Sequence, residues 1–136
     1  MVQYKYLLDT NILSNLIKQP DGKAARKIAA LESENLCCTS VIVACELRYG
    51  AQKKASSILT AKVNQLLEAI AVLPLKHDVE PQYAMMRVAL ERVGTPIGGN
   101  DLLIASHAVA LGLTLVTGNV KEFSRIPDLV IENWLD

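Results

Sequence analysis

The sequence predicts a three-layer α/β/α domain in which helices cover both faces of a central, mostly parallel sheet. Short apolar segments alternate along the chain with longer segments of helical periodicity, which is the order that βαβ units produce. The most apolar segments, residues 6–8 and 113–116, are continuously apolar, as expected for parallel strands buried on both faces. A chain of 136 residues has the length of one domain, and we expect residues 1–136 to form it.

The elements can be assigned in order. Strands are expected at residues 4–8, 36–39, 72–75, 114–116 and 130–132. Helices are expected at residues 12–18, 23–31, 41–53, 57–69, 79–93 and 101–111. Gly94 and Gly112 directly follow the last two helices, where glycine commonly terminates a helix. Asn100 is predicted to cap the start of the last helix.

The composition excludes several classes of protein. Hydrophobic residues make up 51% of the chain and charged residues 21%, which is too apolar for intrinsic disorder and predicts an extensive core. Aromatic residues make up only 4%, so the core should be aliphatic, and binding of nucleic acid by base stacking is disfavoured. Fourteen basic residues balance fourteen acidic ones, which argues against a non-specific nucleic-acid coat but leaves a local basic groove open.

Cysteine usage and hydropathy indicate the compartment. The three cysteines, Cys37, Cys38 and Cys45, form an odd set in apolar surroundings and are predicted to be reduced core thiols. We find no secretory signal, and no apolar segment reaches the roughly 20 residues that a membrane span needs. The expectation is a soluble, cytoplasmic protein.

Three acidic residues lie where the sequence is otherwise apolar. Asp9 directly follows the apolar segment 6–8, Glu46 lies on the apolar stripe of its helix, and Asp101 opens a nearly uncharged helix. A buried carboxylate is costly unless it is paired, hydrogen-bonded or bound to a metal. No basic residue lies three or four positions from Glu46 or Asp101. A shared cation would resolve all three, and oxygen ligands alone favour Mg²⁺ or Mn²⁺.

A carboxylate cluster that holds such ions is typical of phosphodiester hydrolysis, because the metal acidifies a water and neutralises charge on the phosphate. Each acid taken alone also has a structural explanation. Asp9 would serve as a helix cap, and Asp101 as a first-turn acid favoured by the helix dipole. Glu46 is harder to explain in this way. The three acids together therefore favour a metal site.

An ordered set of motifs in this chain resembles the PIN-domain ribonucleases, and closely the VapC toxin subunit of bacterial VapBC toxin–antitoxin pairs. The matching segments are Leu7-Leu8-Asp9-Thr10-Asn11, Ser40-Val41-Ile42, Glu46-Leu47-Arg48-Tyr49-Gly50, Thr95-Pro96-Ile97-Gly98, Asp101-Leu102-Leu103-Ile104-Ala105, His107-Ala108, the segment from Thr117 to Glu122-Phe123, and Glu132-Asn133-Trp134. No single segment is decisive, but the set runs from end to end in order.

The resemblance implies a single PIN-like domain over residues 1–136 with a four-acid pocket. The catalytic acids would be Asp9, Glu46, Asp101 and Glu122, the first three of them ligands of Mg²⁺, for which Mn²⁺ could substitute. Polar residues that would orient these acids are Thr10, Asn11, Thr117 and Asn119. Two departures concern fine positioning: Gly118 replaces a common Asn, and Gly99 replaces a common Pro.

The function implied is that of a metal-dependent endoribonuclease toxin that cuts a structured RNA such as tRNA and blocks translation. The partners implied are RNA, a VapB-type antitoxin and a second copy of the chain, with DNA bound only through the antitoxin and no membrane. Two alternatives remain open: a PIN-fold binding module that has lost catalysis, and an antitoxin-free PIN nuclease of RNA processing.

Overall fold

The structure, a computed structural model, describes residues 3–136. Its strands are β1 (Tyr6–Leu8), β2 (Cys37–Ser40), β3 (Ala71–Leu73), β4 (Thr114–Val116) and β5 (Ile131–Glu132). They form one sheet in the order β3-β2-β1-β4-β5, and every pairing within it is parallel. The predicted parallel sheet is therefore confirmed, and the ends of its strands agree with the predicted ends to within two residues.

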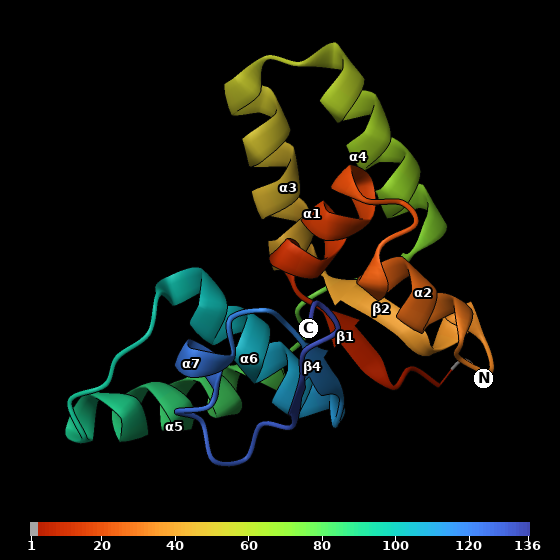
Figure 1. The fold of residues 1–136 in the computed structure, drawn as a ribbon. Coiled ribbons are helices and arrows are strands. Elements are labelled where there is room, and N and C mark those ends of the chain that lie inside the picture. Colours follow the sequence, from red (N-terminus) through yellow and green to blue (C-terminus); the bar gives the residue numbers. More distant parts are fainter. Residues whose placement is uncertain (1–2) are drawn as a thin grey trace.

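The helices are α1 (Thr10–Lys18), α2 (Lys23–Ala29), α3 (Val41–Lys54), α4 (Ser57–Ala69), α5 (Val79–Arg92), α6 (Gly99–Leu111) and α7 (Val120–Phe123), with a 3₁₀ turn at Glu34–Leu36. In Figure 1, α1 to α4 lie on one side of the sheet and α5 to α7 on the other. The six longer helices match the sequence prediction. The turn and α7 are too short to produce a helical period, so the sequence did not predict them.

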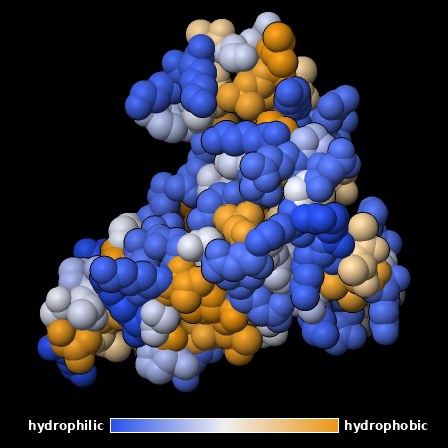
Figure 2. Space-filling view, viewed as in Figure 1, coloured by the Kyte–Doolittle hydropathy of each residue, from blue (hydrophilic) through white to orange (hydrophobic). Residues whose placement is uncertain are grey.

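The molecule has a pronounced hollow. Helices α3 and α4 form a hairpin that extends away from the sheet, and α5 and α6 extend in another direction (Figure 1). The space-filling view shows the surface indented between these two arms, on the left of the picture (Figure 2). The N-terminal end of α6 and helix α7 lie near the base of this indentation in Figure 1.

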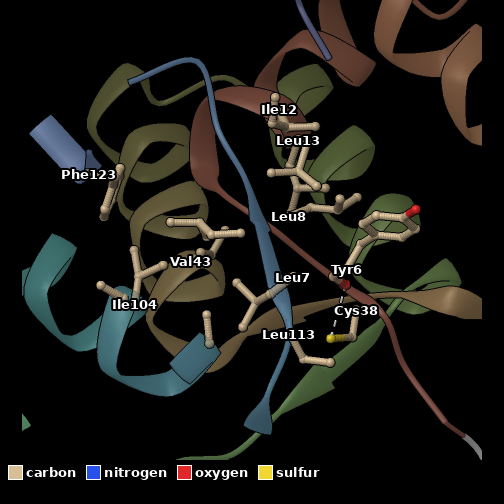
Figure 3. Close-up of a cluster of buried hydrophobic side chains, with 14 of the residues drawn as sticks. Tyr6, Leu7, Leu8, Ile12, Leu13, Cys38, Val43, Ile104, Leu113 and Phe123 are labelled. Atoms are coloured by element: carbon tan, nitrogen blue, oxygen red, sulfur yellow. Dashed lines mark hydrogen bonds between the residues drawn. The ribbon is translucent and has the colours of Figure 1, made fainter. Parts of the chain in front are cut away.

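The core is aliphatic, as the composition predicted. Figure 3 shows Leu7 and Leu8 of β1 packed among side chains from α1, α3 and α6. Both leucines are almost completely buried, because a central parallel strand is covered on both faces. Tyr6 contacts the ring of Trp134 edge-on, with ring centroids 4.9 Å apart, and this contact fixes the C-terminal segment against β1.

Two local predictions were wrong. Asn100 does not cap α6, because the Leu102 amide already bonds to the Gly98 carbonyl oxygen and the helix begins at Gly99. Cys45 is exposed rather than a core thiol, because it lies out of phase with the buried stripe of α3. The terminators were correct: Gly112 ends α6 in a left-handed conformation, with φ +68°.

Within residues 3–136, no helix combines the length and the apolar character needed to cross a bilayer.

Candidate active site

The strand order places a natural site between β1 and β4. From β1 the chain moves to β2 and β3 on one side, and later to β4 and β5 on the other. In open parallel sheets, ligands bind at the carboxyl ends of strands where the order reverses in this way. Asp9 follows β1 and Thr117 follows β4, so both residues lie at this position.

Asp9 is held from two directions. Its Oδ1 accepts a hydrogen bond of 2.8 Å from the Thr10 amide, and its Oδ2 accepts one of 2.7 Å from the Thr117 hydroxyl. The side chain is only 4% exposed. Burial raises the pKa of Asp9, the bonds from Thr117 and Thr10 partly offset this, and the charges of Glu46 and Glu122 raise the pKa further. Asp9 caps α1, as its structural explanation required, and also lies among other acids.

Glu46 reaches the same place from α3. The hydroxyl of Thr10 donates a hydrogen bond of 2.6 Å to Glu46 Oε1. Thr10 therefore links two acids, since its amide bonds to Asp9. The Glu46 side chain is half-buried and belongs to no salt bridge in the part of the chain that the structure describes. Its charge is thus balanced by a hydroxyl donor and not by a base.

Asp101 of α6 and Glu122 of α7 interact with each other. Burial, a hydrogen bond with the Glu122 side chain, and the charges of Glu122, Asp9 and Glu46 together raise the pKa of Asp101 to about 7. Such a hydrogen bond requires a proton on one of the two carboxyl groups. Asn119 donates a bond of 3.0 Å to Glu122 Oε2. The other oxygen, Oε1, is buried and has no hydrogen-bond partner among residues 3–136.

One pocket of about 430 Å³ joins these acids, and it opens to solvent. Its lining residues are Asp9, Thr10, Asn11, Ser14, Asn15, Lys18, Glu46, Asp101, Asn119 and Leu135. Three of the four predicted catalytic acids line this space. Glu122 does not line it directly and reaches it through Asp101.

The predicted orienting residues are also at the site. Thr10 and Thr117 contact Glu46 and Asp9 as described above. Asn119 contacts Glu122 through its side chain, and its amide donates to the Thr117 hydroxyl at 3.0 Å. Asn11 forms no side-chain hydrogen bond to an acid within residues 3–136, and its Oδ1 instead accepts a bond of 2.9 Å from the amide of Gly118. Asn11 thus holds the loop after β4.

The glycine at position 118, where the similar PIN-domain sequences commonly have Asn, has a local explanation. A Cβ atom at this position would lie 2.9 Å from Cδ1 of Leu135, so a larger residue would have to displace Leu135. Leu135 itself lines the acid pocket. The space beside the fourth acid is therefore filled here by an apolar side chain from the C-terminal segment.

The donor chemistry fits a divalent cation. No group of three or more His, Cys, Asp or Glu side chains within residues 3–136 is arranged so that it could hold a metal ion by itself. Mg²⁺ needs only one or two carboxylates, however, because it retains several waters. The unpartnered Glu122 Oε1 and the raised pKa of Asp101 both indicate uncompensated negative charge, which a cation would neutralise.

Sequence reasoning missed the polar face of α1 that lines the pocket. Ser14 and Lys18 line it together with Asn11. Their positions follow Asn11 by three and seven residues, the spacing of one helix face. That periodicity was readable once Asn11 had been placed at the site. Lys18 is the only basic residue among the lining side chains.

Comparison with known proteins identifies the class. Residues 6–129 match the model of the PIN domain family. The chain is 40% identical over 130 residues to "Ribonuclease VapC2" of Rickettsia felis, covering 95% of this chain and 97% of the relative. It is 36% identical over 131 residues to the "tRNA(fMet)-specific endonuclease VapC" of Salmonella typhimurium, covering 96% of this chain and 98% of the relative.

Solved structures agree. The chain superimposes on a crystal structure of VapBC2 from Rickettsia felis bound to a promoter DNA fragment with a TM-score of 0.88 and 39% identity, covering 95% of this chain and 98% of that one. DNA-bound VapBC from Salmonella typhimurium gives a TM-score of 0.84 and 33% identity, over 97% and 99% of the two chains. The protein is therefore a PIN-domain protein and belongs to the VapC ribonuclease family.

Proposed function

We propose that this protein is the toxin of a type II toxin–antitoxin pair, an endoribonuclease that uses Mg²⁺ or Mn²⁺ to hydrolyse a structured RNA such as tRNA. The observation that supports this most directly is the set of three acids, from three separate elements, that line one open pocket. The match to relatives named as ribonucleases extends over almost the whole chain.

Asp9, Glu46 and Asp101 would hold the cation, in part through the waters that it retains, and Glu122 would act beside Asp101. A bound divalent cation would supply an acidified water as the attacking group and would neutralise charge on the phosphate. Thr117 and Thr10 fix the carboxylates of Asp9 and Glu46 in single orientations through their hydroxyls. Preorganised ligands of this kind avoid a reorganisation cost when the ion and the substrate bind.

The pKa of Asp101, raised to about 7, favours a proton on this carboxyl group when no cation is bound. Asp101 would have to lose that proton to act as a ligand of a cation. Asn119 keeps Glu122 oriented toward the site throughout, because its amide group bonds to Oε2.

The partners proposed are RNA as substrate, a small VapB-type antitoxin, and a second copy of the chain. The antitoxin is supported by the similar solved structures, two of which are VapBC complexes bound to DNA. On this proposal, DNA is contacted through the antitoxin, and the protein acts in the cytoplasm. The RNA target is proposed from the relative named for tRNA(fMet).

Purified protein incubated with total bacterial RNA tests the proposal. We expect new RNA 5′ ends in the presence of Mg²⁺ or Mn²⁺, none with excess EDTA, and little cleavage with Ca²⁺. Asp9→Asn protein is the matched control for contaminating nucleases. Cleavage that persists in EDTA would refute the metal mechanism, and an inactive but folded protein would favour the alternative of a PIN-fold binding module.

The toxin assignment needs its own test. Induced expression should arrest growth, and co-expression of the small gene expected beside this one should restore it. Cleavage without any suppressing neighbour would instead support an antitoxin-free nuclease of RNA processing. The two assays therefore separate the activity from its biological role.

A further inference from the structure

A second, smaller recess opens beside the acid pocket. It has a volume of about 150 Å³ and lies between α1, α3 and α4; its lining residues are Thr10, Ser14, Ile17, Lys18, Glu46, Leu47, Gly50, Ala51, Lys54, Leu59 and Val63. Thr10, Ser14, Lys18 and Glu46 line both spaces. The recess therefore adjoins the acid pocket.

The recess combines an apolar floor with a cationic rim. Leu47, Ala51 and Val63 form its buried part. Lys18 and Lys54 are exposed and are the last residues of α1 and α3. Neither lysine belongs to a salt bridge within the described residues 3–136. Both positive charges are therefore available to a ligand.

Helix termination alone does not explain Lys54. A cation in the last turn of a helix is favoured by the helix dipole, and α3 already has Lys53 there. The Lys53 ammonium group, however, lies over the ring of Tyr49, 5.8 Å from its centroid, and Lys53 does not line the recess. Of the two lysines at the end of α3, Lys54 is therefore the one that faces the recess.

We propose that this recess binds a nucleotide of the RNA strand next to the bond that is cleaved, with its base on the apolar floor and its phosphates at Lys18 and Lys54. The inference deepens the proposed function and rests on it. An RNA strand that enters the acid pocket must continue past four carboxyl groups that repel it. Two unpaired lysines at the border of the pocket offset that repulsion.

The chemistry of the recess also limits its ability to discriminate between nucleobases. A nucleobase presents apolar faces and polar edges, and discrimination between bases requires hydrogen bonds to the edges. The Thr10 hydroxyl is already bonded to Glu46, and the buried floor is aliphatic. We therefore expect the recess to tolerate any unpaired base, in the manner of other single-strand sites.

The floor would also accept an apolar peptide. The unpaired lysines decide for RNA, because a polyanion satisfies both charges and an apolar peptide satisfies neither. Gly50 offers a steric probe. It lines the recess, and a Cβ atom added there meets nothing within 4 Å. Gly50→Leu should therefore extend a side chain into the recess, and replacing a helical glycine should not weaken α3.

The test measures RNA binding by Asp9→Asn protein, which should not cleave. Short labelled oligouridylate and oligoadenylate are titrated at several salt concentrations. For single strands the slope of log K against log salt falls by about 0.7 for each phosphate contact. Lys18→Gln with Lys54→Gln should therefore reduce the slope by about 1.4 for both RNAs. The charge-matched control is Lys27→Gln with Lys76→Gln, two exposed lysines outside both spaces, and its slope should stay unchanged.

Gly50→Leu should weaken binding of both RNAs at least tenfold while leaving the fold intact by circular dichroism. An unchanged slope for the Lys18 and Lys54 variant, or a slope that falls equally in the control, overturns the inference. If Gly50→Leu left RNA binding unchanged but weakened antitoxin binding, the recess would be a peptide site, and the inference would be overturned as well. These failures differ from failure of the proposed function, in which wild-type protein would cleave no RNA.

Discussion

The Thr117 hydroxyl donates a buried hydrogen bond of 2.7 Å to Oδ2 of Asp9, across 108 positions in the sequence. The same hydroxyl accepts a bond of 3.0 Å from the amide of Asn119. Thr117 directly follows β4 and Asp9 directly follows β1, and these two strands pair side by side. A single hydroxyl therefore joins the ends of the two central strands, orients Asp9, and fixes the start of the segment that leads to Glu122.

Thr117→Val should test this relationship, because valine has nearly the same shape but cannot hydrogen-bond. It leaves the buried Oδ2 of Asp9 without its donor, and loss of a hydrogen bond to a charged group costs about 1.5–3 kcal/mol. We expect the free energy of unfolding to fall by about that amount and RNA cleavage to fall about ten- to a hundredfold. Chemical denaturation and cleavage assays measure both. Thr117→Ser keeps the hydroxyl and should retain most activity; equal losses in the two variants would contradict the explanation.

The four acids should differ in importance. Asp9→Asn and Asp101→Asn each remove a proposed ligand that lines the pocket, and we expect cleavage to fall by several orders of magnitude. Glu122 lies behind Asp101, and Glu122→Gln should cost about ten- to a hundredfold, or about 1.4–2.7 kcal/mol. Single-turnover rates on one RNA substrate measure the ranking. A Glu122→Gln protein as inactive as Asp9→Asn would contradict it.

Metal-free stability should depend on Asp101 and pH. Because its pKa is raised from 3.8 to about 7 in the folded protein, Asp101 destabilises the fold increasingly as the pH rises from about 4 to about 7. Asp101→Asn removes this effect. The side chain is only half-buried, so solvent screening limits the gain to about 1–2 kcal/mol.

Denaturation in EDTA measures this gain. It should be present at about pH 8 and absent at about pH 4, below the range in which the carboxyl group ionises. A gain of equal size at both pH values would show that packing, and not charge repulsion, causes it.

The buried side chain of His107 should affect the pH dependence of stability in the direction opposite to that of Asp101. His107 lies 2.9 Å from the Ser40 hydroxyl through Nδ1, and the Ser40 hydroxyl also caps α3 by accepting the Ile42 amide. Burial lowers the pKa of His107, while the charge of Asp78 and a bond to the Pro74 backbone partly offset this. The neutral ring therefore stabilises the fold above about pH 6.5, and this contribution is lost as the pH falls below that value.

His107→Asn places an amide oxygen near the position of Nδ1 and cannot titrate. It should preserve the contact with Ser40 but flatten the loss of stability between about pH 6.5 and 5. Urea midpoints of wild type and variant over this range measure the difference. The Asp101 carboxyl contributes with opposite sign in both proteins, so only their difference is informative. An identical pH slope in the two proteins would show that His107 is not the titrating group.

The site was only partly predictable from the sequence. Asp9, Glu46 and Asp101 stood out because each is a carboxylate in an apolar context, and this signal is local. Lys18 gave no such signal, and Lys54 was only one of several clustered basic residues that could contribute to a basic groove, since terminal lysines are common on exposed helix ends. Only the packing of α1, α3 and α4 shows that both line one recess.

The sequence by itself determined the class of fold, the order of the elements and three of the acids, because hydrophobic periodicity and burial cost act within a few residues. The tertiary structure decided the rest. The reversal of strand order between β1 and β4 brings Thr117 to Asp9, and the approach of α7 brings Glu122 to Asp101. These contacts depend on non-local pairing, in which the free energy of many buried side chains selects one arrangement, and no short segment contains that information.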